Sequence, residues 1–190
     1  DGNVNLTPMD AYIAGKALGT LFSQEGDTGA ITGDQRWHTP VLRLAMALGA
    51  SSVGVNVDFS DEILGTGEHG LLSGENPFGH KWMVQISGSH GVPQKNGAKI
   101  KIDKNGNLEP LYGPTLARLY SDAIARNQFR TPGKIGTLKE ISGLTEKLVE
   151  YYDQSLPEVD PDQPVVLSCR NSALIPVLKL LVEKRQLKYV

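Results

Sequence analysis

Short apolar segments of strand length alternate along this chain with longer segments whose apolar residues recur at helical spacing. The pattern predicts helices over residues 8–22, 41–48, 114–126, 138–156 and 173–184. It predicts strands over residues 30–32, 53–59, 83–86, 98–102, 165–167 and 187–190. Residues 60–80 are predicted to be mostly loop, with a short helix as the alternative. Strands that alternate with helices favour helices packed on both faces of one sheet, so we predict an α/β fold with three α/β/α layers. Asn-Gly turns between neighbouring strands indicate some antiparallel pairing and therefore a mixed sheet.

An acidic, proline-rich segment over residues 157–164 is the strongest candidate for a domain boundary. We predict one domain over residues 1–156 and, over residues 157–190, a linker followed by a partial second α/β unit. A single β-α-β piece cannot cover both faces of its own sheet. Self-association would cover the exposed face, so we expect this chain to form a homodimer.

Composition and charge exclude several classes of partner. The chain of 190 residues has a formal net charge of −2 and a sequence pI of about 6.1, which leaves no electrostatic footprint for nucleic acid. No apolar run reaches the length of a membrane span. The single cysteine, Cys169, excludes an internal disulfide, and we therefore expect a cytoplasmic protein.

The chemistry-bearing motif is a Ser-His pair at the end of a predicted strand. The strand over residues 83–86 runs into a loop that contains Ser89 and His90, and Asn96-Gly97 then turns the chain into the next strand. A hydroxyl nucleophile at a rigid strand end, beside an imidazole, suits phosphoryl transfer through a phosphoserine. Taken alone, Ser89 is as well explained as a turn residue, and His90 as a side chain bonded to loop backbone.

The segment resembles the active-site loop of the α-D-phosphohexomutases, the phosphomannomutase/phosphoglucomutase family. That loop reads Thr-(Ala/Gly)-Ser-His-Asn-Pro, and Asn-Gly follows after three more residues. Ser89, His90 and Asn96-Gly97 match the pattern, whereas Gly91-Val92 replaces Asn-Pro. The small Gly88 is closer to the mannose/glucose branch of the family than to its glucosamine branch.

Two further segments carry the resemblance. Residues 32–40 stand where the family has Gly-Arg-Asp-Thr-Arg and then Ser-Pro, with Gly33 in place of the first Arg. Residues 165–173 resemble the strand that opens the family's second domain. The matching residues in these two segments are Asp34, Arg36, Pro40, Cys169 and Asn171.

The resemblance implies reversible conversion of hexose 1-phosphate into hexose 6-phosphate, with hexose 1,6-bisphosphate as the intermediate and Mg²⁺ as the cofactor. It implies that Ser89 carries the phosphoryl group and is this chain's contact to the metal, and that His90 takes part in proton transfer. Lys99, in preference to Lys101 on the same strand face, would reach the phosphoserine as a point charge. Arg36 would bind substrate phosphate. Solvated surface positions are the alternative for both lysines and for Arg36.

The family enzymes have four domains, and the resemblance covers the first domain and the start of the second. The family's Asp-Gly-Asp-Gly-Asp metal loop and its sugar-reading loop do not occur in these 190 residues, so we expect a fragment. Two other functions stay open. The departures at Gly33 and Gly91-Val92 favour a non-catalytic sugar-phosphate-binding or structural module. A dinucleotide-binding enzyme would use the GxGxxG match at residues 65–70, which we disfavour because no helix is predicted directly after it.

The 190-residue chain by itself is expected to have no mutase activity, because it lacks the metal loop and the sugar-reading loop. A coupled assay with glucose 1-phosphate and Mg²⁺ measures this directly. Robust turnover by the chain alone would contradict the interpretation as a fragment.

Overall fold

The computed structural model describes residues 6–76, 79–111, 113–114, 121, 128–158, 160, 164–167 and 172–188. The helices within these residues are α1 (Pro8–Phe22), α2 (Thr39–Ser51), α3 (Thr66–Glu75), α5 (Leu144–Ser155) and α6 (Ile175–Lys184). The strands are β1 (Thr28–Gly33), β2 (Asn56–Ile63), β3 (Trp82–Ile86), β4 (Ala98–Lys104), β5 (Asn107–Pro110) and β6 (Leu138–Glu140). The helix predicted over residues 114–126 falls largely outside the described part of the chain.

The described strands form one sheet in the order β5-β4-β3-β1-β2-β6. Strand β1 lies at its centre and is parallel to both β2 and β3. Strand β6 is parallel to β2, whereas β4 is antiparallel to β3 and β5. The sheet is therefore mixed, as predicted.

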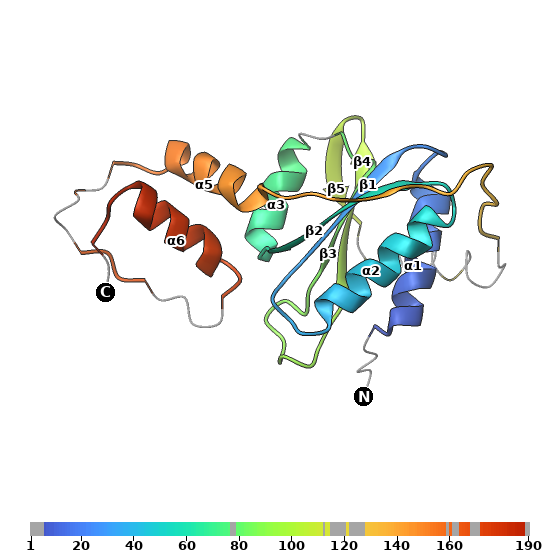
Figure 1. The fold of residues 1–190 in the computed structure, drawn as a ribbon, viewed down its shortest axis with the longest axis horizontal. Coiled ribbons are helices and arrows are strands. Elements are labelled where there is room, and N and C mark those ends of the chain that lie inside the picture. The colour runs from blue at the N-terminus through green and yellow to red at the C-terminus, as the bar shows by residue number, and fades with distance from the viewer. Residues whose placement is uncertain are drawn as a thin grey trace.

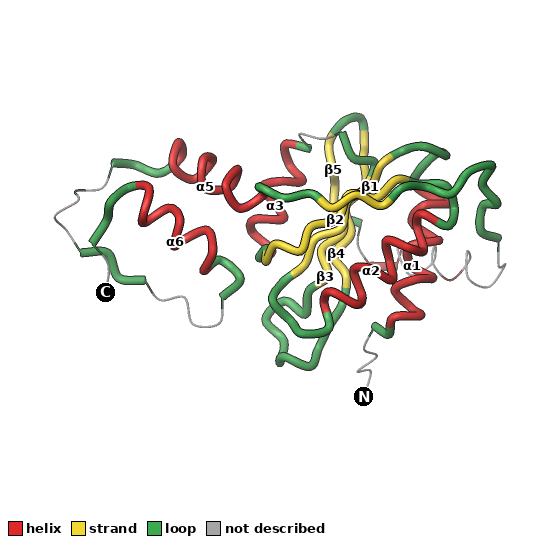
Figure 2. The backbone as a smooth tube through the Cα atoms, viewed as in Figure 1, coloured by secondary structure: helices red, strands yellow, loops and turns green. Residues whose placement is uncertain are grey.

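Helices cover both faces of this sheet (Figure 1). On one face, α1 and α2 pack against Ile31, Trp82 and Val84. On the other face, Leu72 of α3 and Leu148 of α5 belong to the cluster that includes Ala30 and Met83 of the sheet. Figure 2 shows the strands between the two sets of helices. The α/β fold with three layers is confirmed.

Helix α1 occupies the predicted range because its start is encoded locally. Thr7 Oγ1 accepts a hydrogen bond from the backbone N–H of Asp10, and the Asp10 carboxylate accepts one from the N–H of Thr7, which makes a capping box. Hydrogen bonding from Thr7 lowers the pKa of Asp10. Pro8 follows at the first helical position, where it loses no hydrogen bond.

Helices α1 and α2 approach closely at two glycines. A Cβ atom on Gly15 would lie 2.0 Å from the carbonyl oxygen of Met46, and a Cβ on Gly49 would lie 1.9 Å from that of Tyr12. No side chain fits at such distances. The backbones of the two helices are therefore in direct contact at these glycines. This contact holds the two helices of one layer together.

The helix predicted over residues 138–156 is wrong in its first part. Residues Leu138–Glu140 form β6, which pairs with the edge of β2 in the register Val57↔Leu138. Gly143 then takes a φ of 80°, and α5 begins at Leu144. The Glu62 carboxylate accepts hydrogen bonds from the N–H groups of Leu144 and Thr145, at 3.0 and 2.7 Å. Partners from a distant strand, which a local pattern cannot reveal, decide where this helix starts.

The prediction of mostly loop over residues 60–80 is wrong, but the short helix that it left open is present. Strand β2 continues to Ile63, and α3 occupies Thr66–Glu75. The glycines at 67, 70 and 74 lower the intrinsic helix propensity, but Leu64 and Leu72 are buried in the cluster beneath α3. Burial of this apolar face outweighs the local preference.

The strand predicted over residues 165–167 is reduced to one bridge, in which the N–H of Val165 donates to the carbonyl of Lys188 at 2.8 Å. Val166 is 78% exposed, so this segment is not buried. Helix α6 packs on α5, and Arg185 Nε is 2.7 Å from Asp153 Oδ1. The domain boundary near residue 157 and the homodimer stay predictions. Within the described residues, no helix is long and apolar enough to span a bilayer.

Replacing Gly49 by alanine should destabilise the chain by about 1–3 kcal/mol, because the new methyl group would force α1 and α2 apart. Gly74 offers a matched control, since it lies in α3 and a Cβ there would meet nothing within 4 Å. Gly74→Ala should stabilise by about 0.5–1 kcal/mol. Urea unfolding of both variants measures the difference, and equal effects would show that the helix contact does not require glycine.

Candidate active site

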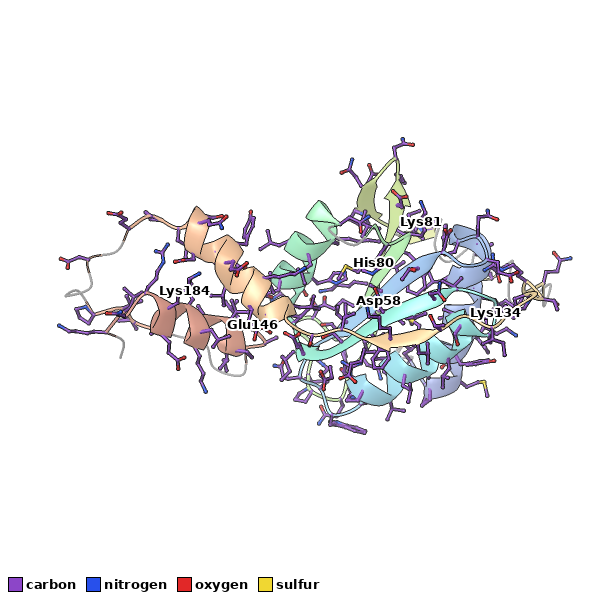
Figure 3. The ribbon with its side chains drawn as sticks, turned by 45° about the horizontal axis from the view of Figure 1, so that its top comes forward. Asp58, His80, Lys81, Lys134, Glu146 and Lys184 are labelled. Carbon is purple, nitrogen blue, oxygen red and sulfur yellow. The ribbon has the colours of Figure 1, made fainter. Side chains whose placement is uncertain are left out.

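The loops that follow β1, β2 and β3 meet at one edge of the sheet, because these strands run parallel. Together with residues that precede α6 they line a hollow of about 1030 Å³. Open α/β sheets bind ligands at this edge. The lining residues are 34–37, 65–68, 87, 89–91, 93 and 172–174. His80 lies at the opposite end of β3, where its Nε2 is 2.9 Å from Asp58 Oδ2 (Figure 3).

Ser89 is held in an unusual backbone conformation beside this hollow. Strand β3 ends at Ile86, and Ser87 Oγ accepts a hydrogen bond from the N–H of Ser89 at 3.0 Å. Ser89 itself has a φ of 53°, the left-handed region that residues with a Cβ rarely occupy. Conformations of this kind cost about 1–3 kcal/mol and persist where the surroundings impose them. The conformation that places this hydroxyl beside the hollow therefore lowers the stability of the fold.

Lys99 meets Ser89 from the neighbouring strand. Side chains alternate along β4, so Ile100 packs under α1 and α2 while Lys99 lies on the α3 face. Lys99 Nζ donates to Thr66 Oγ1 at 2.5 Å and to Ser89 Oγ at 3.3 Å. Burial lowers the pKa of Lys99, with Asp34 acting in the opposite direction. Lys101 points elsewhere, to Ser73 Oγ and the carbonyl of Gly70.

His90 is adjacent to the same hydroxyl, with 3.5 Å between its Nδ1 and Ser89 Oγ. This separation is at the outer limit of a hydrogen bond. The imidazole is exposed at the rim of the hollow. It lies within reach of a proton that leaves or enters Ser89.

Arg36 organises the loop that carries Ser89. Its Nε donates to the carbonyl of Lys95 at 2.8 Å, and its Nη2 donates to the carbonyls of Gly91 and Ser89 at 2.8 and 3.3 Å. Its Nη1 pairs with Asp34 Oδ2 at 2.6 Å, and both side chains are nearly buried. The guanidinium thus spans the loop from Ser89 to Lys95. The predicted contact of Arg36 with substrate phosphate stays a prediction.

Gly88 makes room for this arginine. A Cβ on Gly88 would lie 2.4 Å from the carbonyl oxygen of Lys95 and 2.6 Å from Arg36 Nε. The small residue at this position is therefore explained by packing against Arg36. The assignment of Gly88 to the mannose/glucose branch of the family stays a prediction.

Two further histidines near the site, His69 and His38, are buried. His69 Nδ1 is 3.1 Å from Thr32 Oγ1, and burial, followed by the charges of Lys101 and Lys99, lowers the pKa of His69 to about 3. Burial also lowers the pKa of His38. Among the described residues, no three His, Cys, Asp or Glu side chains gather to hold a metal ion.

Thr66 is a site residue that sequence reasoning missed. It is the first residue of α3, directly behind Gly65, and the structure contradicts the expectation that no helix follows that glycine. The available signal was the strand-to-helix turn at the carboxyl end of β2. The third glycine of a dinucleotide fingerprint serves close helix–strand packing, but a Cβ on Gly70 would meet nothing within 4 Å. Gly70 therefore lacks the close helix–strand packing that explains the third glycine in a dinucleotide-binding fingerprint.

Comparison with known proteins gives consistent results. A family model described as phosphoglucomutase/phosphomannomutase, alpha/beta/alpha domain I, matches residues 2–124. A phosphoglucosamine mutase of Desulforapulum autotrophicum is 30% identical over 198 residues, covering 93% of this chain and 42% of the relative. A phosphomannomutase of Vibrio cholerae is 27% identical, covering 80% of this chain and 31% of the relative.

The fold is also similar to that of a solved structure from this family. A phosphoglucomutase/phosphomannomutase family protein from Burkholderia thailandensis superimposes with a TM-score of 0.77 at 22% identity, over 97% of this chain and 40% of that protein. At this identity the likeness concerns the fold alone. The chain thus spans about two fifths of the phosphoglucosamine mutase and of this solved structure.

Replacing Arg36 by lysine should open the Ser89 loop, because an ammonium cannot bond three carbonyls and a carboxylate in one plane. The N–H groups of Gly91 and Lys95, which donate to the carbonyls of Gly88 and Val92, should exchange with deuterium about tenfold faster, as expected for a loss near 1.4 kcal/mol.

Arg130 provides the matched control for this variant. It donates to the carbonyls of Val53, Ser23 and Gly19 at 2.7, 2.7 and 2.9 Å, away from the loop. Arg130→Lys should leave exchange in the Ser89 loop unchanged. Equal exchange in both variants would show that Arg36 does not hold the loop.

Proposed function

This chain belongs to the phosphoglucomutase/phosphomannomutase family, and on that premise we propose that its parent protein interconverts hexose 1-phosphate and hexose 6-phosphate through phosphorylated Ser89. The observation that carries the proposal is the distance of 3.3 Å between Ser89 Oγ and Lys99 Nζ. The loop that contains Ser89 is held by hydrogen bonds from Arg36 to its backbone carbonyls. Ser89 and His90 line the hollow, and Lys99 reaches the Ser89 hydroxyl from β4.

Phosphoryl transfer to Ser89 starts from a hexose 1,6-bisphosphate. Ser89 Oγ forms a bond to one phosphorus atom while the bond from that phosphorus to the sugar oxygen breaks. The products are phosphorylated Ser89 and a hexose monophosphate, and the Ser89 proton ends on the leaving oxygen or on His90. Negative charge on the transferred oxygens faces Lys99, whose position is fixed by Thr66.

The reverse step completes the conversion. A hexose monophosphate presents its free hydroxyl to phosphorylated Ser89, the Oγ–phosphorus bond breaks, and the bisphosphate forms again. Both directions use the same groups, so the reaction needs positioning and charge stabilisation more than covalent chemistry from the protein. In this proposal Arg36 is a positioning residue, since its donors are engaged with the loop backbone and Asp34.

Mg²⁺ remains part of the proposal only as a cofactor of the whole protein. Ser89 would be this chain's contact to it, and we derive no step through the metal. The names of the relatives divide between a phosphoglucosamine mutase and a phosphomannomutase, so we propose the class of hexose phosphates. A cytoplasmic location belongs to the same proposal.

Incubation of the parent protein with the 1,6-bisphosphates of mannose, glucose and glucosamine, with Mg²⁺ present, should add one phosphoryl group at Ser89. Intact-mass and peptide mass spectrometry measure the site. Lys99→Met should slow the uptake about 100-fold, as expected for removing a group that stabilises charge in the transition state. Ser89→Ala should abolish it.

Ser155→Ala is the matched control, because the Ser155 hydroxyl only donates to the carbonyl of Tyr151 on α5. This variant should take up the phosphoryl group at the normal rate. A phosphoryl group on another residue, or none at Ser89, would count against the mutase and in favour of a non-catalytic module.

A further inference from the structure

One of the two tryptophans of the chain is left in water. Trp82 is fully buried, and its Nε1 donates to Ser23 Oγ at 2.9 Å. Trp37 is 78% exposed. Exposing so large an apolar side chain forgoes the stabilisation that its burial would give. The position of Trp37 therefore calls for a reason outside the folding of the core.

Trp37 lines the same hollow as Ser89. Among the described residues that line it, Trp37 is the only Trp, Tyr or Phe, and most of the others are small or polar. A ligand in this hollow that presents both a charged and an apolar surface would find one large apolar surface to pack against. That surface is the indole of Trp37.

The indole is also held in place. Its ring makes an edge-to-face contact with the imidazole of His38, with 5.1 Å between the ring centres and 85° between the planes, and His38 is buried. The turn beneath it is fixed, since Asp34 Oδ1 accepts from the N–H of Arg36 and the carbonyl of Arg36 accepts from the N–H of Thr39. A ring that is already positioned loses little conformational entropy when a ligand binds.

Arg36 links this ring to the nucleophile. It precedes Trp37 in the chain, and its guanidinium donates to the carbonyl of Ser89. Arg36 is thus connected both to Trp37 and to the Ser89 loop, and Trp37 and Ser89 line the same hollow. A ligand whose phosphate faces Ser89 can extend toward Trp37 within this hollow.

We propose that Trp37 is a sugar-binding residue, against which the pyranose ring of a hexose phosphate packs while its phosphate faces Ser89. One face of a pyranose consists largely of C–H groups, which pack on an aromatic surface, while its hydroxyl groups stay hydrated. This inference rests on the proposed function, because it takes the hexose phosphate from there. It adds the residue that distinguishes a sugar phosphate from phosphate alone.

Tryptophan fluorescence tests the contact directly in the 190-residue chain. Acrylamide, a neutral quencher, reaches Trp37 but not the buried Trp82. Glucose 6-phosphate and mannose 6-phosphate should protect Trp37 from quenching, whereas inorganic phosphate should not. Quenching that is unchanged at sugar-phosphate concentrations up to solubility would overturn the proposal.

Calorimetric titration of variants supplies the second readout. Trp37→Ala should raise the Kd for hexose 6-phosphate about fivefold to tenfold, as expected for the loss of one aromatic packing contact. It should leave the Kd for inorganic phosphate unchanged, and Trp37→Phe should keep most of the affinity. Ile135→Ala, at another apolar residue that is 68% exposed, is the control and should change neither value. An equal loss for both ligands in Trp37→Ala would make Trp37 merely structural and overturn the proposal.

The outcomes separate this inference from the proposed function. Uptake of a phosphoryl group at Ser89 without protection of Trp37 would leave the mutase in place and remove the role of Trp37. Protection of Trp37 without phosphorylation of Ser89 would keep Trp37 as a sugar-binding residue and remove the mutase. Failure to bind any hexose phosphate overturns both.

Discussion

The architecture depends on one constraint, the parallel pairing of β1 with a neighbour on each side. Parallel strands need long crossovers, which here are α2 between β1 and β2, and α3 between β2 and β3. The first crossover moves outward from β1 and the second moves back across it. Right-handed crossovers in opposite directions place their helices on opposite faces. The layers and the shared edge for the three following loops result from this pairing.

The candidate site uses that edge together with one antiparallel strand. Strand β4 returns beside β3 with Lys99 opposite Gln85, so the lysine comes back to the place where the chain left β3. Thr66 at the start of α3 and Ser89 in the loop then share the same ammonium. One side chain thus joins three segments, of which the start of α3 lies 33 residues before Lys99. A change in the register of β4 by one residue would turn Lys99 to the opposite face of the sheet.

The hydrogen bonds of Arg36 order a loop whose small residues would by themselves leave it flexible. Small residues at 88 and 91 leave the segment after β3 open, yet four groups from Ser89 to Lys95 and Asp34 converge on one guanidinium. This bonding imposes the left-handed conformation of Ser89 on a residue that would not choose it. The loop is flexible by composition and ordered by a side chain that lies more than fifty residues earlier.

Local signals in the sequence determined the elements whose stability is local. The capping box at Thr7 and the apolar period placed α1, and the apolar run before the Ser-His pair placed the Ser89 loop directly after a strand. Tertiary structure alone decided the elements that depend on distant partners. Strand β6 exists because β2 offers an open edge, and α5 begins where Glu62 caps it. Helix α3 forms over a glycine-rich stretch because Leu72 is buried. The contact of Lys99 with Thr66 and Ser89, and the position of Trp37 at the hollow that Thr66 and Ser89 also line, belong to this second kind. A sequence pattern reflects the interactions of each residue with its neighbours along the chain. The candidate site, in contrast, is made of side chains that only the packed sheet brings together.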